Sequence, residues 1–199
     1  SHYPDGRWDV AITPLQSDAQ LWEHYRWSVN PDQRREAALI LSSRSSDSPH
    51  RRRHLLTGQG WGPAPMAAVA VKQQALAAKA LGLREEALQH WRGLLARFPT
   101  SVASADARYH LAALEPKLRE ELLRLQPAHP AALAAAAELP DDADQDLVQS
   151  SALHLARWGA SWPGAERLLR QACTAITGEG LEQQQRLQLA AALAELGDG

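Results

Sequence analysis

The chain has 199 residues, of which 22% are charged, and a formal net charge of −2. This length allows one or two domains, and the near-neutral charge argues against nucleic acid as a partner, because nucleic-acid-binding domains are usually basic. No run of about 18 apolar residues is present, so we expect no transmembrane segment. The single cysteine, Cys173, excludes an internal disulfide.

The residue types predict an all-α protein. Alanine, leucine, arginine and glutamine are abundant, whereas isoleucine, valine and phenylalanine are scarce. The abundant residues favour helices, and the β-branched enrichment that is typical of strands is missing. Hydrophobic steps of three and four residues predict about eleven helices with short links between them.

The chain opens with a segment that lacks any hydrophobic period. Residues 1–16 contain Pro4, Gly6 and Pro14, which predicts an extended N-terminal arm. Ser17 then begins the pattern S-D-A-Q, a capping box that starts the first helix. The predicted buried face of this helix consists of Leu21, Trp22, Tyr25 and Val29.

Asn30-Pro31 is expected to end the first helix, and Pro31 fits the first turn of the second. A short third helix should end near Gly58. The segment 58–65, G-Q-G-W-G-P-A-P, holds three glycines and two prolines and predicts the least regular linker inside the chain.

Two apolar stripes follow this linker and predict a helical hairpin over residues 66–100. Gly82 and Pro99 lie just past the two stripes, where helices commonly stop. The few residues between the helices require the second to fold back antiparallel on the first. The first stripe is Met66, Val69, Ala70, Ala77, Ala80 and Leu81, and the second is Ala87, Leu88, Trp91, Leu94, Leu95 and Phe98.

The remaining sequence predicts more helices of the same kind. We expect them near 101–114, 116–125, 130–139, 142–158 and 163–176, followed by a last helix of about 16 residues. Their predicted inward residues include Leu118, Leu122 and Leu125 in one helix and Leu187, Ala190, Ala191 and Ala194 in the last. The organisation expected from these elements is a single helical-repeat domain over 17–199.

The hairpin resembles a tetratricopeptide repeat. Ala75, Gly82, Ala87, Trp91 and Pro99 stand at the spacings of that motif: a small residue, a turn glycine, a small and then an aromatic residue, and a closing proline. No other helix pair reproduces this spacing. The resemblance implies an α-solenoid of stacked antiparallel helical hairpins, degenerate and tetratricopeptide-like.

A second resemblance covers about 60 residues. The linker G-Q-G-W-G-P-A-P, the alanine-rich hairpin and the segment W-R-G-L-L-A-R-F-P-T-S-V-A-S-A-D-A-R-Y-H-L are similar to the helical region of bacterial soluble lytic transglycosylases. That family cleaves peptidoglycan with a lysozyme-like domain, whose Glu-Ser pair and Gly-Leu-Met-Gln stretch are both missing here. The resemblance therefore implies a catalytic domain outside this chain.

These resemblances give two functional expectations. The first is a non-catalytic scaffold of a cell-envelope or periplasmic protein, with an adjoining catalytic domain and peptidoglycan as partners. The alternative is a tetratricopeptide-like adaptor, cytoplasmic in that case, which binds a peptide or protein partner. Both concern binding, because solenoid folds present extended surfaces to their partners.

Residues with catalytic or metal-binding chemistry are present but scattered, so we expect no catalytic residue, metal site or cofactor. His50 and His54 have a metal-compatible spacing, but three arginines lie between them and oppose a cation. Adjacent glutamates at 85–86 and 120–121 point about 100° apart on a helix and do not converge. Cys173 lies on an apolar stripe and is expected in the core.

Two candidate binding features remain. Arg51, Arg52 and Arg53, together with Arg44, form a basic cluster that predicts a site for a phosphate or an acidic protein segment. A solubilising surface cluster is the alternative. Trp61, in the glycine- and proline-rich linker, is the tryptophan that we expect to be exposed to a ligand.

Overall fold

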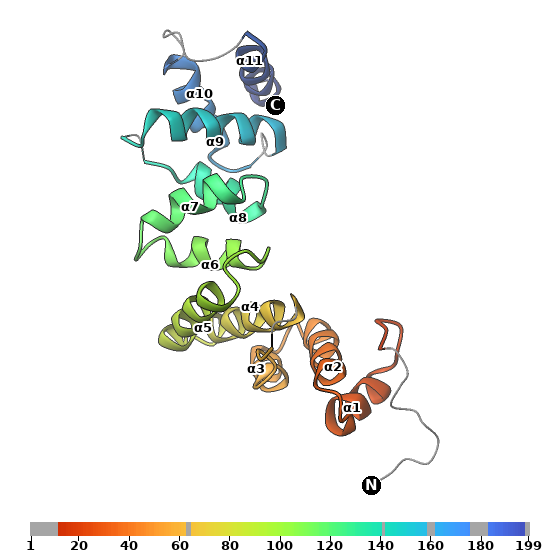
Figure 1. Ribbon diagram of the computed structural model, residues 1–199. Coiled ribbons are helices and arrows are strands. Elements are labelled where there is room, and N and C mark those ends of the chain that lie inside the picture. The colour runs from red at the N-terminus through yellow and green to blue at the C-terminus, as the bar shows by residue number, and fades with distance from the viewer. Residues whose placement is uncertain (1–11, 63–64, 141, 159–161, 176–182, 198–199) are drawn as a thin grey trace. The chain divides into compact units, whose positions relative to one another are not determined.

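The computed structural model describes residues 12–62, 65–140, 142–158, 162–175 and 183–197 (Figure 1). Over these residues the chain forms eleven helices and no strand, so the predicted all-α class and the helix number are confirmed. No helix in these ranges is long and apolar enough to cross a bilayer. The helices are α1 (Asp18–Trp27), α2 (Pro31–Arg44), α3 (Pro49–Leu56), α4 (Pro65–Ala80), α5 (Arg84–Arg97), α6 (Ser104–Leu111), α7 (Lys117–Leu125), α8 (Pro130–Ala137), α9 (Gln145–Trp158), α10 (Ala165–Ala175) and α11 (Gln183–Gly197).

The helix starts follow the capping residues of the sequence. The Ser17 amide donates to Gln20 Oε1 at 2.9 Å, and the Gln20 amide donates to Ser17 Oγ at 3.4 Å. This reciprocal pair is the predicted capping box. The Asp32 amide donates to Asn30 Oδ1 at 2.9 Å, with Pro31 in the first turn of α2.

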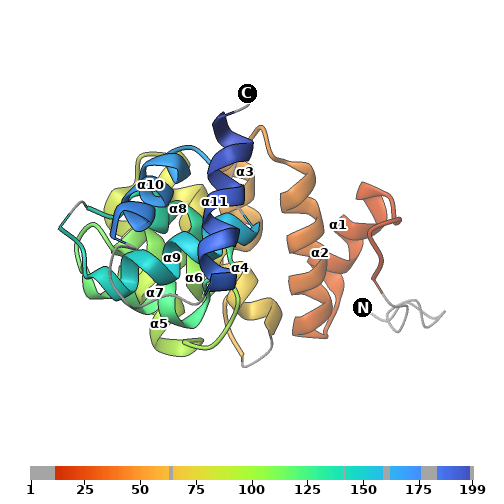
Figure 2. The ribbon, with the colours of Figure 1, turned by 90° about the horizontal axis from the view of Figure 1, so that it is seen from above.

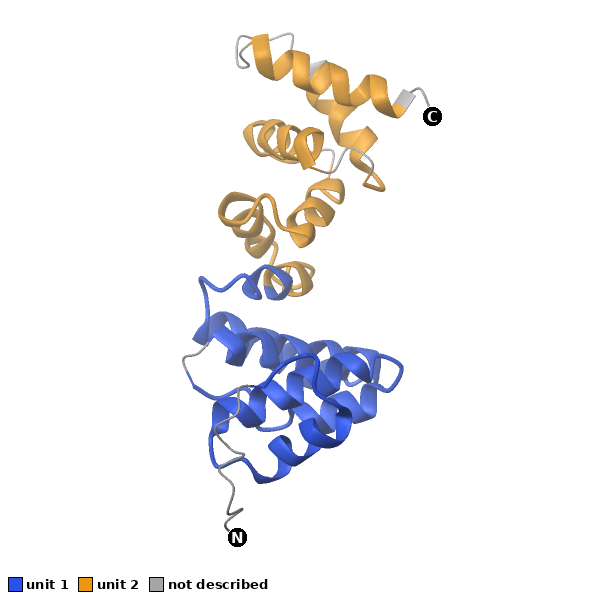
Figure 3. Cartoon of the chain, turned by 90° about the vertical axis from the view of Figure 1, so that its right-hand side faces the viewer, with its two compact units in different colours: residues 1–107 blue, residues 108–199 orange. Residues whose placement is uncertain are grey.

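The helices divide into two compact units, residues 1–107 and 108–199 (Figure 3). The sequence predicts one domain from residue 17, with its least regular point at 58–65. The boundary between the two compact units lies within α6. The described linker residues, Gly58–Gly62, belong to the first unit.

In the first unit, each helix packs on its neighbour in the sequence. α1 packs on α2, α2 on α3, and α3 on α4, and α4 also contacts α2 (Figures 1 and 2). The core beneath α1 and α2 contains Leu21, Ala37, Leu41 and Leu55.

The end of the N-terminal segment joins this core and is not an extended arm. Ile12 is buried in the same cluster, and the Gln16 amide donates to the Thr13 carbonyl at 3.2 Å, which closes a turn. Arg44 of α2 donates to the carbonyl of Gln16 at 2.8 Å. The arm prediction is therefore wrong for 12–16, and residues 1–11 lie outside the described residues.

The predicted hairpin is α4 and α5, which pack along each other. Gly82 joins them with a φ of +73°, a conformation that residues with a side chain adopt only at a cost. Ala75 and Ala87 are buried, and the Trp91 ring is 1% exposed. Small residues allow close approach of the helices, and the indole fills the largest volume of this core.

In the second unit, α9 is the central helix. It packs on α7, α8, α10 and α11, and α10 also contacts α8 and α11. The core of this unit includes Leu122, Val148, Leu155, Leu168, Leu169 and Leu189.

Several predicted inward faces are wrong. Val29 is exposed because α1 already ends at Trp27, and Leu125 is exposed at the last position of α7. In α11 the buried residues are Leu189 and Ala192, so the predicted stripe of Leu187, Ala190, Ala191 and Ala194 faces solvent. In α4 the residues Met66, Val69 and Ala80 of the predicted stripe are likewise exposed. When alanine occupies several faces of a helix, the hydrophobic periodicity does not identify the buried face. Packing against the neighbouring helices then decides which face is buried.

Candidate binding site

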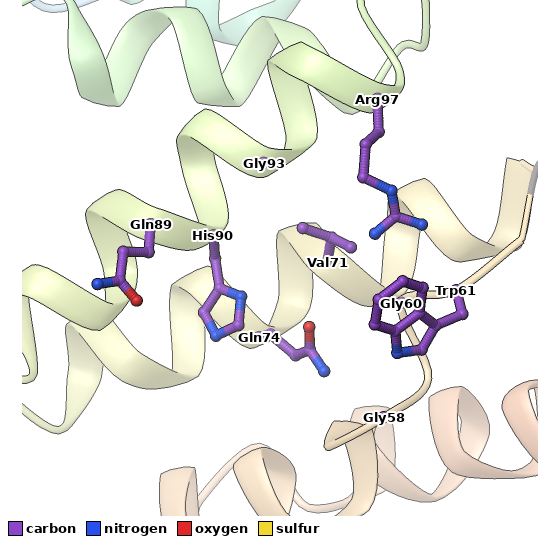
Figure 4. A pocket seen from close by; sticks show the side chains of 9 residues that line it. All are labelled: Gly58, Gly60, Trp61, Val71, Gln74, Gln89, His90, Gly93 and Arg97. Carbon is purple, nitrogen blue, oxygen red and sulfur yellow. The ribbon is translucent and has the colours of Figure 1, made fainter.

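A pocket of about 260 Å³ opens in the first unit between the loop Gly58–Gly62, α4 and α5 (Figure 4). Gln74 of α4 and His90 of α5 extend toward the same space, and Arg97 lies over Trp61 at the other end. The residues that line this pocket, called here the Trp61 pocket, are Gly58, Gly60, Trp61, Val71, Gln74, Gln89, His90, Gly93 and Arg97.

A buried arginine holds the loop that carries Trp61. Arg35 of α2 is 5% exposed, and it donates from Nε to the Gln59 carbonyl at 2.9 Å and from Nη2 to the Trp61 carbonyl at 2.6 Å. Its third group, Nη1, pairs with Asp32. The loop Gly58–Gly62 is therefore anchored by charge-assisted hydrogen bonds. Arg35 is not among the residues that the sequence predicts for this site. Its position three residues before Ala38, which is buried, places both residues on one face of α2 and was the signal that could have identified it.

The same loop lies directly against α4. Gly60 is buried, and a Cβ atom at this position would be 2.6 Å from Val71 Cγ2, which leaves no room for any side chain. Gln74 Nε2 donates to the Leu56 carbonyl just before the loop. The loop is thus fixed on two sides, by α2 and by α4.

The predicted exposure of Trp61 is found: the residue is 73% exposed. The guanidinium carbon of Arg97 lies 5.3 Å from the Trp61 ring centroid and 4.9 Å from that of Phe98. Both distances suit a cation–π interaction. Trp61 therefore offers an open indole surface beside a positioned cation.

A second pocket, of about 460 Å³, also has Arg97 in its lining. Val69 and Val102 are exposed in it, and Ala68 is buried. Its lining is mostly apolar and includes two hydroxyl residues, Thr100 and Ser101. The residues that line this second pocket, called here the Phe98 pocket, are Pro65, Ala68, Val69, Arg97, Phe98, Pro99, Thr100, Ser101, Val102 and Ala103.

His90 connects the Trp61 pocket to an ion pair. Its Nε2 lies 3.6 Å from Glu86 Oε1, and Glu86 accepts from Arg53 Nε at 2.8 Å and from Arg53 Nη2 at 2.9 Å. These hydrogen bonds from Arg53 are the main cause that lowers the pKa of Glu86 and raises the pKa of Arg53. The pair ties α3 to α5.

We expect Glu86→Gln to destabilise the protein at about pH 7 but to have little effect at about pH 2. Because the pKa of Glu86 is lowered in the folded state, the stabilisation is complete above the ordinary glutamate pKa of about 4.3. It is lost as pH falls through the lowered value. Urea denaturation of both proteins across this range measures the difference. Glu85→Gln, at an exposed neighbouring position, is the control, and an E86Q effect that does not vary with pH would contradict the expectation.

The predicted basic cluster does not form one open surface, because successive helix residues point about 100° apart. Arg53 pairs with Glu86, and the Arg51 guanidinium lies 5.5 Å from the Trp22 ring centroid. Arg52 is partly buried, and its Nε has no partner among the described residues. Arg44, the fourth member, pairs with Asp18 on α1.

The remaining candidates are found apart from one another. His50 and His54 are exposed, and the described ranges hold no group of three or more residues suited to a metal ion. Burial raises the pKa of the Cys173 thiol, which opposes nucleophilic reactivity. Glu120 pairs with Arg124 at 3.7 Å, and Glu121 with Arg108 at 3.5 Å.

Comparisons with protein-family models, curated proteins and solved structures give no match to this chain. The chemistry of the two pockets is therefore the basis for a functional inference. Together they supply one guanidinium, two glutamine amides, an imidazole, an exposed indole and an apolar wall. Groups of this kind orient and hold a ligand.

Proposed function

We propose that the chain is a non-catalytic helical scaffold and binding domain, whose partner lies in the groove formed by the Trp61 and Phe98 pockets. One observation carries this proposal: Trp61 is the most exposed tryptophan of the described residues, yet Arg35 holds its loop in place. Large exposed aromatic groups are typical of binding surfaces. A rigid loop reduces the conformational entropy lost on binding.

The more specific form of the proposal is the helical region of a lytic-transglycosylase-type protein of the cell envelope. In that form the partners are an adjoining catalytic domain and peptidoglycan. The indole of Trp61 supports it, because the C–H face of a sugar ring stacks on an aromatic ring. The exposed amide of Gln89 can hydrogen-bond to hydroxyl or N-acetyl groups.

The alternative is a tetratricopeptide-like adaptor for a peptide or protein, and the Phe98 pocket favours it. The wall of this open pocket is mostly apolar, so a leucine or phenylalanine side chain of a peptide can be buried against it, whereas a sugar presents mainly hydroxyl groups. Both forms place the partner in the same groove.

Co-sedimentation with purified peptidoglycan sacculi tests the cell-envelope form. We expect the wild-type chain to sediment with sacculi and Trp61→Ala to bind at least about tenfold more weakly, because the stacking surface is lost. Trp27→Ala is the matched control, since Trp27 is 61% exposed in the same unit but lies outside both pockets.

If the wild-type chain and Trp61→Ala sediment equally with sacculi, Trp61 does not contact the peptidoglycan. Absence of sedimentation for the wild-type chain would remove peptidoglycan as the partner. The adaptor form would then be the remaining one.

A further inference from the structure

Arg97 is the residue that the two pockets share. It is among the lining residues of both the Trp61 pocket and the Phe98 pocket. Its guanidinium lies within cation–π distance of both aromatic rings. A ligand that occupies both pockets therefore passes over Arg97.

Among the described residues, no carboxylate pairs with the guanidinium of Arg97. Its guanidinium contacts the Trp61 and Phe98 rings and forms no ion pair or hydrogen bond with any residue in the described parts of the chain. By contrast, Arg35 and Arg53 pair with carboxylates and carbonyls nearby. A ring contact leaves the N–H groups at the rim of the guanidinium available as donors.

We infer that the groove across Arg97 binds an extended protein segment, which places an aspartate or glutamate carboxylate on Arg97 and an apolar side chain in the Phe98 pocket. A main-chain amide of the segment meets the exposed amide of Gln89. This inference rests on the proposed binding role and names the partner of that same groove.

Three features of the pockets match groups that a protein segment carries, and they favour such a segment as the ligand. The guanidinium matches a carboxylate in charge and in planar geometry. The apolar walls of Val69, Phe98 and Val102 match an aliphatic or aromatic side chain. A glutamine amide both donates and accepts, as does a peptide group. A peptide supplies all three groups within a few residues.

Other anionic partners fit less well. Among the described residues that line the two pockets, Arg97 is the one arginine or lysine. Polyphosphate backbones require a series of cations, so a nucleic acid is disfavoured here. The net charge of −2 disfavours a polyanion further.

The test is selection of a phage-displayed library of random heptapeptides on the full chain. We expect the enriched peptides to carry aspartate or glutamate within about three residues of leucine, isoleucine or phenylalanine, a spacing that an extended chain can reach across the groove. Synthetic versions of these peptides should bind Arg97→Gln at least about tenfold more weakly than wild type. Arg97→Lys should restore part of the affinity, because it keeps the charge but not the fork geometry.

Two further variants separate the contributions. Val102→Ser, at an exposed position in the Phe98 pocket, should weaken the same peptides without unfolding the protein. Arg84→Gln, at an exposed position of α5 outside both pockets, should leave their affinity unchanged. Circular dichroism confirms that each variant is folded.

The inference is overturned if no peptide is enriched, if the enriched peptides lack an acidic residue, or if they bind wild type and Arg97→Gln equally. Binding to sacculi in the absence of peptide enrichment would refute the protein segment and retain the proposed binding role. If the chain neither binds sacculi nor enriches any peptide, the proposed binding role itself would be refuted.

Discussion

Replacing Trp91 with alanine is expected to lower the free energy of unfolding by about 3–5 kcal/mol. The ring is 1% exposed and is the largest fully buried side chain of the described residues. Its neighbours on α5, Ala87 and Leu94, are also buried, so the substitution removes the indole from the interior of the core. Urea denaturation followed by far-UV circular dichroism measures the change.

Trp27→Ala is the control for this measurement, because it removes an equal volume from a side chain that is 61% exposed. We expect that substitution to change the stability by less than about 1 kcal/mol. A Trp91→Ala effect as small as that of the control would mean that α5 does not pack through this face.

Replacing Arg35 with methionine is expected to lower the free energy of unfolding by about 2–3 kcal/mol and to free the loop Gly58–Gly62. Methionine keeps most of the buried aliphatic volume but provides no donor for the carbonyls of Gln59 and Trp61. Asp32 is mostly exposed and regains water, which limits the cost. Urea denaturation gives the free energy, and limited proteolysis reports cleavage in the loop.

Arg34→Met is the matched control, since Arg34 is the exposed neighbour on the same helix. We expect it to leave both the stability and the cleavage rate near wild type. If Arg35→Met were cleaved in the loop no faster than this control, the loop would be held by Gln74 and Gly60 alone.

The sequence predicts well those features that are determined by near neighbours. The capping box at Ser17, the proline start of α2 and the turn at Gly82 each involve residues within four positions of one another. The hairpin and the buried Trp91 follow from a clear stripe of large and small residues. For the same reason the all-α class and the number of helices are confirmed.

The faces of the alanine-rich helices are predicted poorly. In α11, alanine occupies both the predicted stripe and the face that is buried with Leu189. A methyl group contributes little burial energy on either face, because the hydrophobic effect scales with buried area. Larger side chains on the neighbouring helices then decide the orientation, and a single helix sequence does not contain them.

The candidate site is predicted in part. Trp61 was expected to be exposed, but the roles of Arg35 and Arg97 were not. Arg35 acts on carbonyls 24 and 26 residues further along the chain. Arg97 lies over a ring in a loop that precedes α4. The consecutive arginines at 51–53 predict a cluster in the sequence, but consecutive helix positions point in different directions.

The anchoring of the loop by Arg35 has a thermodynamic consequence for the first unit. Any ligand that binds only the ordered loop also stabilises the hydrogen bonds between that loop and α2, by mass action. The occupancy of the groove and the resistance of α2 to local opening are therefore linked quantities, although no ligand atom needs to contact α2. A substitution that increases local opening of α2 would reduce the fraction of molecules with an ordered loop. The apparent affinity of a ligand at Trp61 would fall in proportion to that fraction.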